Sequence, residues 1–131
     1  MRPNVEYLPK PEATTTEFML QVLDQYYERK WNPNKDTVTA VRTWRNWPMV
    51  VRMPDIQKDY TVMIDGGRVQ SVAAGLPKDP RILSIMLAET MQRIYYDEST
   101  AAIELIAGRI KVRGNETERR RMLAAISYLT W

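Results

Sequence analysis

The ten residues Tyr60-Thr-Val-Met-Ile-Asp-Gly-Gly-Arg-Val69 indicate the class of the fold. Every second residue from Tyr60 to Ile64 is large and apolar, which is the period of a strand with one buried face. Asp65-Gly66-Gly67 comes next, and a tight hairpin turn needs the positive φ that glycine adopts freely. The stretch therefore predicts two antiparallel strands joined by a short turn, with the second strand at residues 68–74.

Two further strands are expected before this hairpin. Residues 37–44 are rich in Thr, Val and Trp, which suit strands. Residues 47–53 form the next apolar stretch, and Pro48 stands where a strand start or a sheet edge tolerates it. Four consecutive short strands joined by tight turns predict an antiparallel meander.

Helical periodicity flanks the meander on both sides. A helix is expected over residues 15–31, and a long one after Asp79-Pro80, because proline suits the first helical position. A shorter helix over residues 101–106, a fifth strand over residues 109–113 and a last helix after Asn115 follow. The predicted order is α-β-β-β-β-α-α-β-α in a single domain, residues 1–131, whose residues 1–13 form an extended arm.

A second segment, Ala107-Gly-Arg-Ile-Lys-Val-Arg-Gly-Asn115, alternates basic and apolar residues between two glycines. It resembles the strand before the last helix in the sterol carrier protein 2 family, and residues 60–69 resemble that family's strand-turn-strand. The resemblance covers about residues 17–130. It implies an α+β fold in which helices cover a five-stranded antiparallel sheet, with an apolar tunnel between the layers. Members bind fatty acyl chains, acyl-CoA, phospholipids or sterols, and others serve as accessory or oligomerisation domains.

Two missing residue types remove much of the chemistry open to an enzyme. The chain has no Cys and no His, so thiol nucleophiles, thiolate and imidazole metal sites and Ser-His-Asp triads are excluded. The adjacent acids Asp97 and Glu98 do not share a helix face. We therefore expect no enzyme activity, no metal and no cofactor. No run of 18 apolar residues occurs, so we expect no membrane span and a cytoplasmic location.

Positive charge gathers near the end of the chain. Between Arg109 and Arg121 there are six basic and two acidic residues, whereas the whole chain carries a net charge of +3. Such a patch can meet phosphates on nucleic acid or anionic lipid, or it can be a solvated strand face and helix start. Because no dedicated nucleic-acid motif accompanies the charge, a nucleic-acid partner is not expected.

Met-rich apolar helix faces predict where a hydrophobic ligand would lie, since methionine adapts to irregular shapes. With the family resemblance, they suggest a tunnel lined by Leu83, Met86, Leu87, Met91, Ile103, Ile106, Met122 and Ile126. A filled core would give the same pattern. Arg109, Lys111 and Arg113 are candidate contacts for a carboxylate or phosphate head group, although strand alternation sets them opposite Ile110 and Val112.

Two functions remain open at this point. The first is a lipid-binding, carrier-like domain that holds an acyl chain, an acyl-CoA or a sterol-like molecule between sheet and helices. The second is a non-catalytic dimerisation or enzyme-accessory module with the same fold and no ligand. Trp44 and Trp47, with Arg42 and Arg45 beside them, motivate the second because aromatic and Arg side chains are favoured at interfaces, including those of a homodimer.

Overall fold

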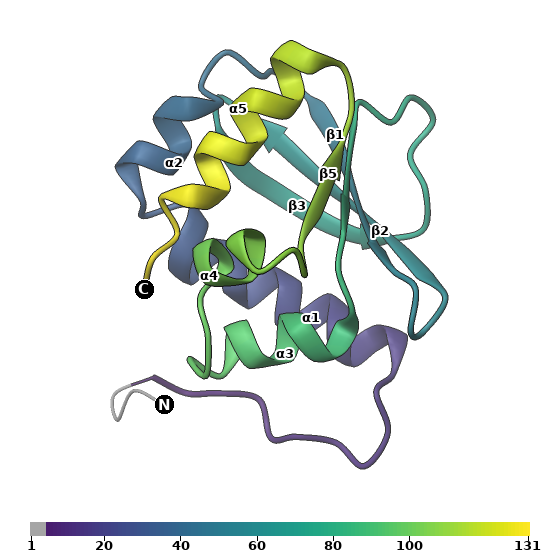
Figure 1. Ribbon diagram of the computed structural model, residues 1–131. Helices are drawn as coiled ribbons and strands as arrows, with labels where there is room; N and C mark the ends of the chain where they lie inside the picture. Colours follow the sequence, from purple (N-terminus) through teal and green to yellow (C-terminus); the bar gives the residue numbers. More distant parts are fainter. Residues whose placement is uncertain (1–4) are drawn as a thin grey trace.

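The computed structural model describes residues 5–131, in which a five-stranded sheet is covered by helices (Figure 1). The strands lie in the order β3-β2-β1-β4-β5. Their bounds are Trp47–Met53 (β1), Lys58–Asp65 (β2), Arg68–Ala74 (β3), Ile82–Ile85 (β4) and Lys111–Arg113 (β5). The β1–β4 pair is parallel and the other pairs are antiparallel. The α+β class and the five-stranded sheet are confirmed, and the sheet is mixed where an antiparallel one was expected.

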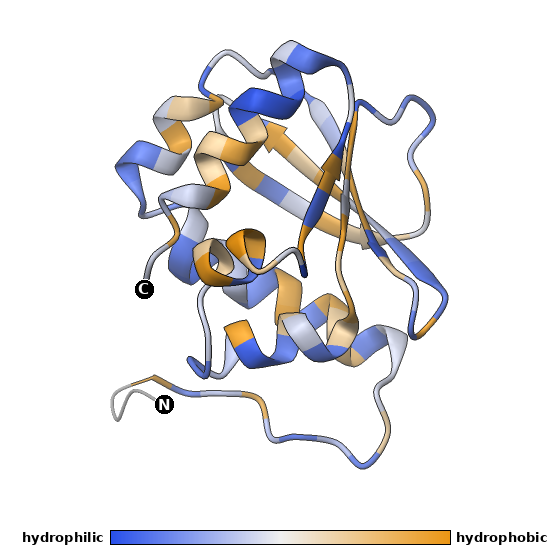
Figure 2. Cartoon of the chain, viewed as in Figure 1, coloured by the Kyte–Doolittle hydropathy of each residue, from blue (hydrophilic) through white to orange (hydrophobic). Residues whose placement is uncertain are grey.

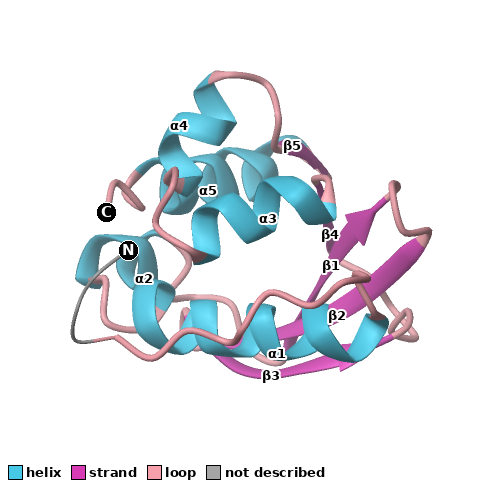
Figure 3. Cartoon of the chain, turned by 90° about the horizontal axis from the view of Figure 1, so that it is seen from below, coloured by secondary structure: helices cyan, strands magenta, loops and turns pink. Residues whose placement is uncertain are grey.

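The helices gather on one side of this sheet (Figure 3). Within the described residues they are α1 (Thr16–Tyr26), the π-helical turn η1 (Tyr27–Trp31), α2 (Lys35–Ala40), α3 (Ala88–Tyr95), α4 (Ala101–Ile106) and α5 (Glu116–Ser127). Helix α1 packs on β3 and α3, and α5 packs on α2, α4 and β5. The buried apolar residues of the two layers form one core cluster, and hydrophobic residues are seen on the sheet and on the helices in Figure 2.

The hairpin predicted from residues 60–69 joins β2 to β3. Gly66 and Gly67 form its turn with φ values of +61° and +85°. Gly67 also lies against α2, where a Cβ atom would come within 2.2 Å of the carbonyl oxygen of Val38. The indole nitrogen of Trp31 donates a hydrogen bond to the Gly67 carbonyl over 2.8 Å. The turn is therefore fixed by the helices as well as by its own sequence.

Residues 37–44 form no strand, and this part of the sequence prediction is wrong. Asn34 caps α2 instead, since its side chain accepts a hydrogen bond from the amide of Thr37 over 3.0 Å. The hydroxyl of Thr37 donates to the carbonyl of Ala125 in α5 over 2.8 Å. The Thr and Val residues suit a strand in isolation, but the cap and the packing on α5 favour a helix.

The long helix predicted after Asp79-Pro80 is wrong over its first part. Residues 82–85 form β4, and α3 begins only at Ala88. A short apolar run fits a buried strand as well as a helix, and here it pairs with β1. The carboxylate of Asp55, from the turn after β1, accepts hydrogen bonds from the amides of Ala88 and Glu89 over 2.8 and 3.4 Å. A residue distant in sequence thus fixes where α3 starts.

The N-terminal arm packs along the end of α1 and along α3 (Figures 1 and 3). Residues 5–13 contain no helix or strand, in agreement with the expected arm, and residues 1–4 of that arm lie outside the described residues. The amide of Leu8 donates to the hydroxyl of Tyr95 over 2.8 Å, and the hydroxyl of Tyr96 donates to the Leu8 carbonyl over 2.5 Å. Tyr95, the last residue of α3, and Tyr96, which follows it, therefore hold the arm in place.

The two tryptophans that suggested a partner surface pack on each other. Trp44 is buried in the core, and its ring stacks on that of Trp47 with the centroids 4.9 Å apart. The guanidinium of Arg81 lies over the Trp47 ring, 4.9 Å from its centroid. Trp44 therefore contributes to the core.

Candidate functional site

A small apolar cavity lies between the sheet and the helices. Its volume is about 30 Å³, which leaves room for roughly one or two water molecules. The residues around it come from α1, η1, β1, β4, α3, α4, α5 and the segments beside them. They are Tyr26, Tyr27, Trp31, Met49, Ser84, Met86, Met91, Ile94, Ala101, Ile110, Met122, Ile126 and Leu129.

Four methionines from four parts of the fold meet at this cavity. Met49 lies on β1, Met86 follows β4, Met91 lies on α3 and Met122 on α5, and all four are buried. A methionine side chain has three rotatable bonds and no branch. A wall of this kind rearranges more readily than one of β-branched residues, whose first torsion angle is restricted.

Half of the predicted tunnel residues border the cavity. They are Met86, Met91, Met122 and Ile126. Met122 and Ile126 are four residues apart and so lie on one face of α5. Met91 shares the inner face of α3 with Ile94. The helical period therefore identified the inward residues Met91 of α3 and Met122 and Ile126 of α5.

The other four predicted tunnel residues do not border the cavity. Leu83 lies on β4 between Ser84 and Ile82, which are buried, so strand alternation turns it to the other face. Leu87 is the exposed residue before α3. Ile103 and Ile106 lie on the outer face of α4, where Ile106 is 87% exposed. Strand β4 replaces the part of the expected helix that held Leu83, and on α4 the inward face is that of Ala101, Ala102 and Glu104.

A buried carboxylate takes the inward position on α4 that the sequence analysis gave to isoleucines. The side chain of Glu104 is 1% exposed and lies 3.2 Å from Nη2 of Arg93. It also pairs with Nε of Arg109. Burial raises the pKa of Glu104, but hydrogen bonds from Arg109 and Arg93 outweigh it, so the pKa lies below the ordinary value. Arg109 is thus engaged by Glu104, while Lys111 and Arg113 point to solvent from the edge strand β5.

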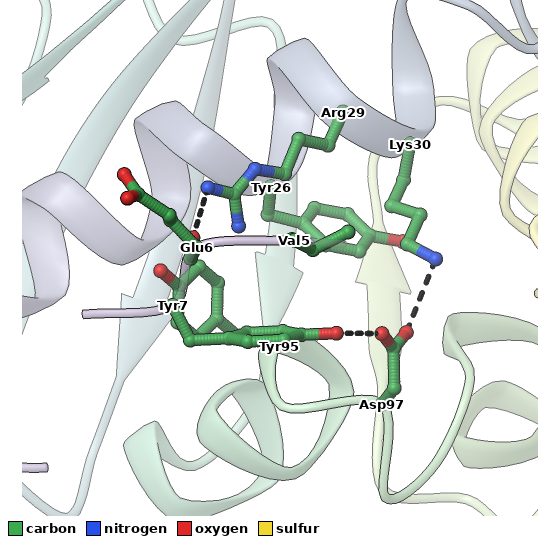
Figure 4. Close-up of a pocket in the computed structure, with 8 residues that line it drawn as sticks. All are labelled: Val5, Glu6, Tyr7, Tyr26, Arg29, Lys30, Tyr95 and Asp97. Carbon is green, nitrogen blue, oxygen red and sulfur yellow. Dashed lines mark hydrogen bonds and ion pairs between the residues drawn. The ribbon is translucent and has the colours of Figure 1, made fainter. Parts of the chain in front are cut away.

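A larger, polar pocket lies beneath the N-terminal arm (Figure 4). Its volume is about 310 Å³. Three segments supply its wall: the arm, the end of α1 together with η1, and the end of α3 together with the residues after it. The lining residues are Val5, Glu6, Tyr7, Tyr26, Arg29, Lys30, Tyr95 and Asp97.

Asp97 organises one side of this polar pocket. Its carboxylate accepts a hydrogen bond from the hydroxyl of Tyr7 and lies 3.1 Å from Nζ of Lys30 (Figure 4). Its backbone is in the left-handed region, with φ at +58°. Lys30 is buried and belongs to the π-helical turn η1, a kind of turn that is frequent at functional sites. A matched pair of charges is therefore held under the arm.

Tyr26 forms part of the wall of both hollows. It is 5% exposed, and its hydroxyl has no hydrogen-bond partner among residues 5–131. Burial raises the pKa of Tyr26, so the hydroxyl remains a neutral donor. Arg29 donates from Nη2 to the backbone carbonyl of Glu6, while its Nη1 is buried without a partner in the described chain. Two hydrogen-bond donors are thus left unused at this pocket.

The polar pocket was not predicted from the sequence. Tyr26, Arg29 and Lys30 were placed only within the helix expected over residues 15–31. The available signal was spacing, because residues 26, 29 and 30 are three and four apart and share a helix face. The arm and Asp97, which complete the pocket, come from distant parts of the chain.

The fold places the chain among known structures. The ubiquinone synthesis protein UbiJ-SCP2 superposes with a TM-score of 0.57 and 12% identity, over 88% of this chain and 94% of that one. A sterol carrier protein 2 superposes with a TM-score of 0.52 and 17% identity, over 80% and 88% of the two chains. The protein has the sterol carrier protein 2 fold. Palmitated SCP2L2 from Aedes aegypti shares this fold, with a TM-score of 0.51 and 15% identity over 80% and 90% of the chains.

No protein-family model and no curated protein sequence matches the chain. At 12–17% identity, the SCP2 likeness therefore rests on the path of the backbone. Within residues 5–131, no helix has the length and apolarity needed to cross a bilayer. The same residues contain no group of three acidic side chains placed to hold a metal ion.

Proposed function

We propose that this SCP2-fold domain is a non-catalytic lipid-binding domain that holds an acyl chain in the apolar cavity between sheet and helices. The observation that carries the proposal is the meeting of Met49, Met86, Met91 and Met122 at an apolar cavity in this fold. The palmitated state of the Aedes aegypti protein of the same fold supports an acyl chain as the ligand class.

The cavity must enlarge to accept such a ligand. Its volume is about 30 Å³, whereas small-molecule sites in proteins typically measure about 300–1,000 Å³. The methionine side chains supply the space by changing rotamers. Burial of ten methylenes contributes roughly 8 kcal/mol at about 0.8 kcal/mol each, against which the costs of opening and association are set. Medium and long acyl chains are therefore expected to bind, and very short ones are not.

The test fills the cavity from one side. Ala101 is buried at the start of α4 and borders the cavity. Ala101→Leu adds three carbons there, at a cost to stability of about 1–3 kcal/mol for overpacking. Ala107→Leu is the matched control, because Ala107 is exposed at the end of the same helix. Native mass spectrometry with laurate measures the fraction of chains that carry one ligand.

Wild type and Ala107→Leu are expected to load laurate with equal affinity, and Ala101→Leu at least tenfold more weakly. Circular dichroism verifies that all three chains are folded at the temperature of the binding measurement. The proposal fails when wild type binds no laurate, or when folded Ala101→Leu binds it as well as the control does.

A further inference from the structure

The geometry points to a carboxylate subsite in the polar pocket beneath the arm, formed by Nη1 of Arg29 and the hydroxyl of Tyr26. This inference rests on the proposed function and extends it. The ligand class becomes a mono-anionic amphiphile, a free fatty acid, whose head group lies in the polar pocket and whose tail lies in the apolar cavity.

Two buried donors at the polar pocket have unused hydrogen-bonding capacity. Buried donors nearly always have a partner in folded proteins, yet the Tyr26 hydroxyl and Arg29 Nη1 have none among the described residues. Both residues line the same pocket of about 310 Å³. Leaving such groups without a partner costs free energy. An acceptor oxygen that reached these two atoms would remove that cost, so the pair favours a ligand with acceptor oxygens.

The charged side chains of the polar pocket are not all paired with one another. Lys30 lies 3.1 Å from the carboxylate of Asp97, so these two charges offset one another. Arg29 instead donates to a backbone carbonyl, that of Glu6, which does not neutralise a guanidinium. Among residues 5–131 the Arg29 guanidinium therefore forms no ion pair, and the other acidic side chain of the pocket, that of Glu6, is exposed to solvent. Asp97 in the same pocket disfavours a doubly charged group such as a phosphate monoester, and a single carboxylate matches both the charge and the two donors.

The polar pocket and the apolar cavity also lie next to each other. Tyr26 lines both of them, and on α3 the neighbouring residues Ile94 and Tyr95 face the apolar cavity and the polar pocket respectively. Figure 4 shows Arg29, Lys30 and Tyr26 reaching the polar pocket from the same stretch of helix. A ligand with one charged end and one apolar end fits two such hollows, because Tyr26 has the polar pocket on one side and the apolar cavity on the other.

The arm explains how the subsite is kept from water. The rings of Tyr7 and Tyr95 each lie with their centroids 5.8 Å from the Arg29 guanidinium. The arm residues Val5, Glu6 and Tyr7 form one wall of the pocket. A carboxylate bound there would be shielded from solvent, which strengthens its hydrogen bonds to the two donors.

The experiment compares a charged and an uncharged ligand of equal chain length. Binding of laurate and of 1-dodecanol is measured by calorimetry at pH 8 for wild type, Arg29→Gln, Tyr26→Phe and the control Arg120→Gln. Arg120 is exposed on α5 and pairs with Glu116, away from the pocket. Wild type and Arg120→Gln are expected to bind laurate at least tenfold more tightly than dodecanol. Arg29→Gln removes that preference and leaves dodecanol affinity unchanged.

Tyr26→Phe gives a second readout that a purely structural hydroxyl would not give. It is expected to weaken laurate binding about fivefold while the melting temperature of the free protein stays the same or rises, because an unpartnered hydroxyl is removed. Arg29→Lys, which retains the charge, restores part of the laurate preference.

The outcomes separate the two levels of the proposal. Equal affinity of wild type for laurate and dodecanol, or an equal loss for both ligands in folded Arg29→Gln, overturns the carboxylate subsite while lipid binding stands. Binding of neither ligand by wild type overturns the proposed function and the subsite with it.

Discussion

Replacement of Glu104 by glutamine tests whether the buried charge cluster stabilises the helical layer. Glu104 is 1% exposed, whereas its partners Arg93 and Arg109 have side chains 33% and 49% exposed. Breaking a fully buried ion pair costs about 3–5 kcal/mol. The two arginines reach solvent and glutamine keeps one acceptor oxygen, so we expect a loss of about 2.5 kcal/mol in the free energy of unfolding. For a chain of this size, that lowers the melting temperature by about 9 °C.

The assay is urea denaturation followed by tryptophan fluorescence at several pH values. Hydrogen bonds from the arginines hold the pKa of Glu104 below its ordinary value, so the carboxylate stabilises the fold fully above the unfolded pKa of about 4.3. The stabilisation is lost as pH falls below that value and through the lowered folded pKa. The gap between wild type and Glu104→Gln should thus be constant from pH 6 to 8 and shrink in acid.

A control and a refuting result complete this test. Glu28 is exposed in the π-helical turn η1, and Glu28→Gln is expected to change the free energy of unfolding by less than about 0.5 kcal/mol. If Glu104→Gln changes it as little as Glu28→Gln does at pH 7, the carboxylate contributes no net stability and the reasoning is wrong. A gap that stays constant down to pH 3 would contradict the assignment to an ionised Glu104.

Two further substitutions test the contacts of α2. Gly67→Ala places a Cβ 2.2 Å from the Val38 carbonyl oxygen. It is expected to lower the free energy of unfolding, measured by denaturation, by more than about 3 kcal/mol. The control Gly75→Ala, with φ at +100° and open space around it, should lower it by only about 1 kcal/mol. Thr37→Val removes the hydrogen bond to Ala125 and should cost about 1–3 kcal/mol in the same assay; an unchanged midpoint would show that this bond does not hold α2 on α5.

The parts of the fold that could be predicted from sequence are those with local signals. The β2–β3 hairpin carries its own turn residues, and Asn115 begins α5 by accepting a hydrogen bond from the amide of Glu118, as expected. The predictions for two segments, residues 37–44 and 82–85, were wrong because contacts with distant parts of the chain decide their structure. Helix α5 packs on the first segment, and strand β1 pairs with the second. These two errors compensate, so four consecutive strands are still found and α2 is the added element.

The candidate site also contains residues that a local pattern predicts and residues that it does not. Met91, Met122 and Ile126 followed from helical period, because the inner face of a helix is fixed by its own sequence. Ile103 and Ile106 were predicted wrongly because α4 buries Glu104, which pairs with two arginines, and no apolar pattern reveals such a burial. The pocket under the arm joins residues about 70–90 positions apart in the chain, so its composition could not be derived from local spacing.

The contacts that fix the helices bear on how an acyl chain would enter the apolar cavity. Helix α3 is held at its start by Asp55 and beyond its end by the arm through Asp97, and Glu104 ties it to α4 through Arg93. Moving α3 away from the sheet would break these polar contacts together. Rotation of methionine side chains breaks none of them. Enlargement of the cavity is therefore less costly by rotation of its side chains than by displacement of α3. Met91 is the methionine that α3 contributes to the wall. A substitution that restricts its side chain is the first place to look for slower ligand exchange.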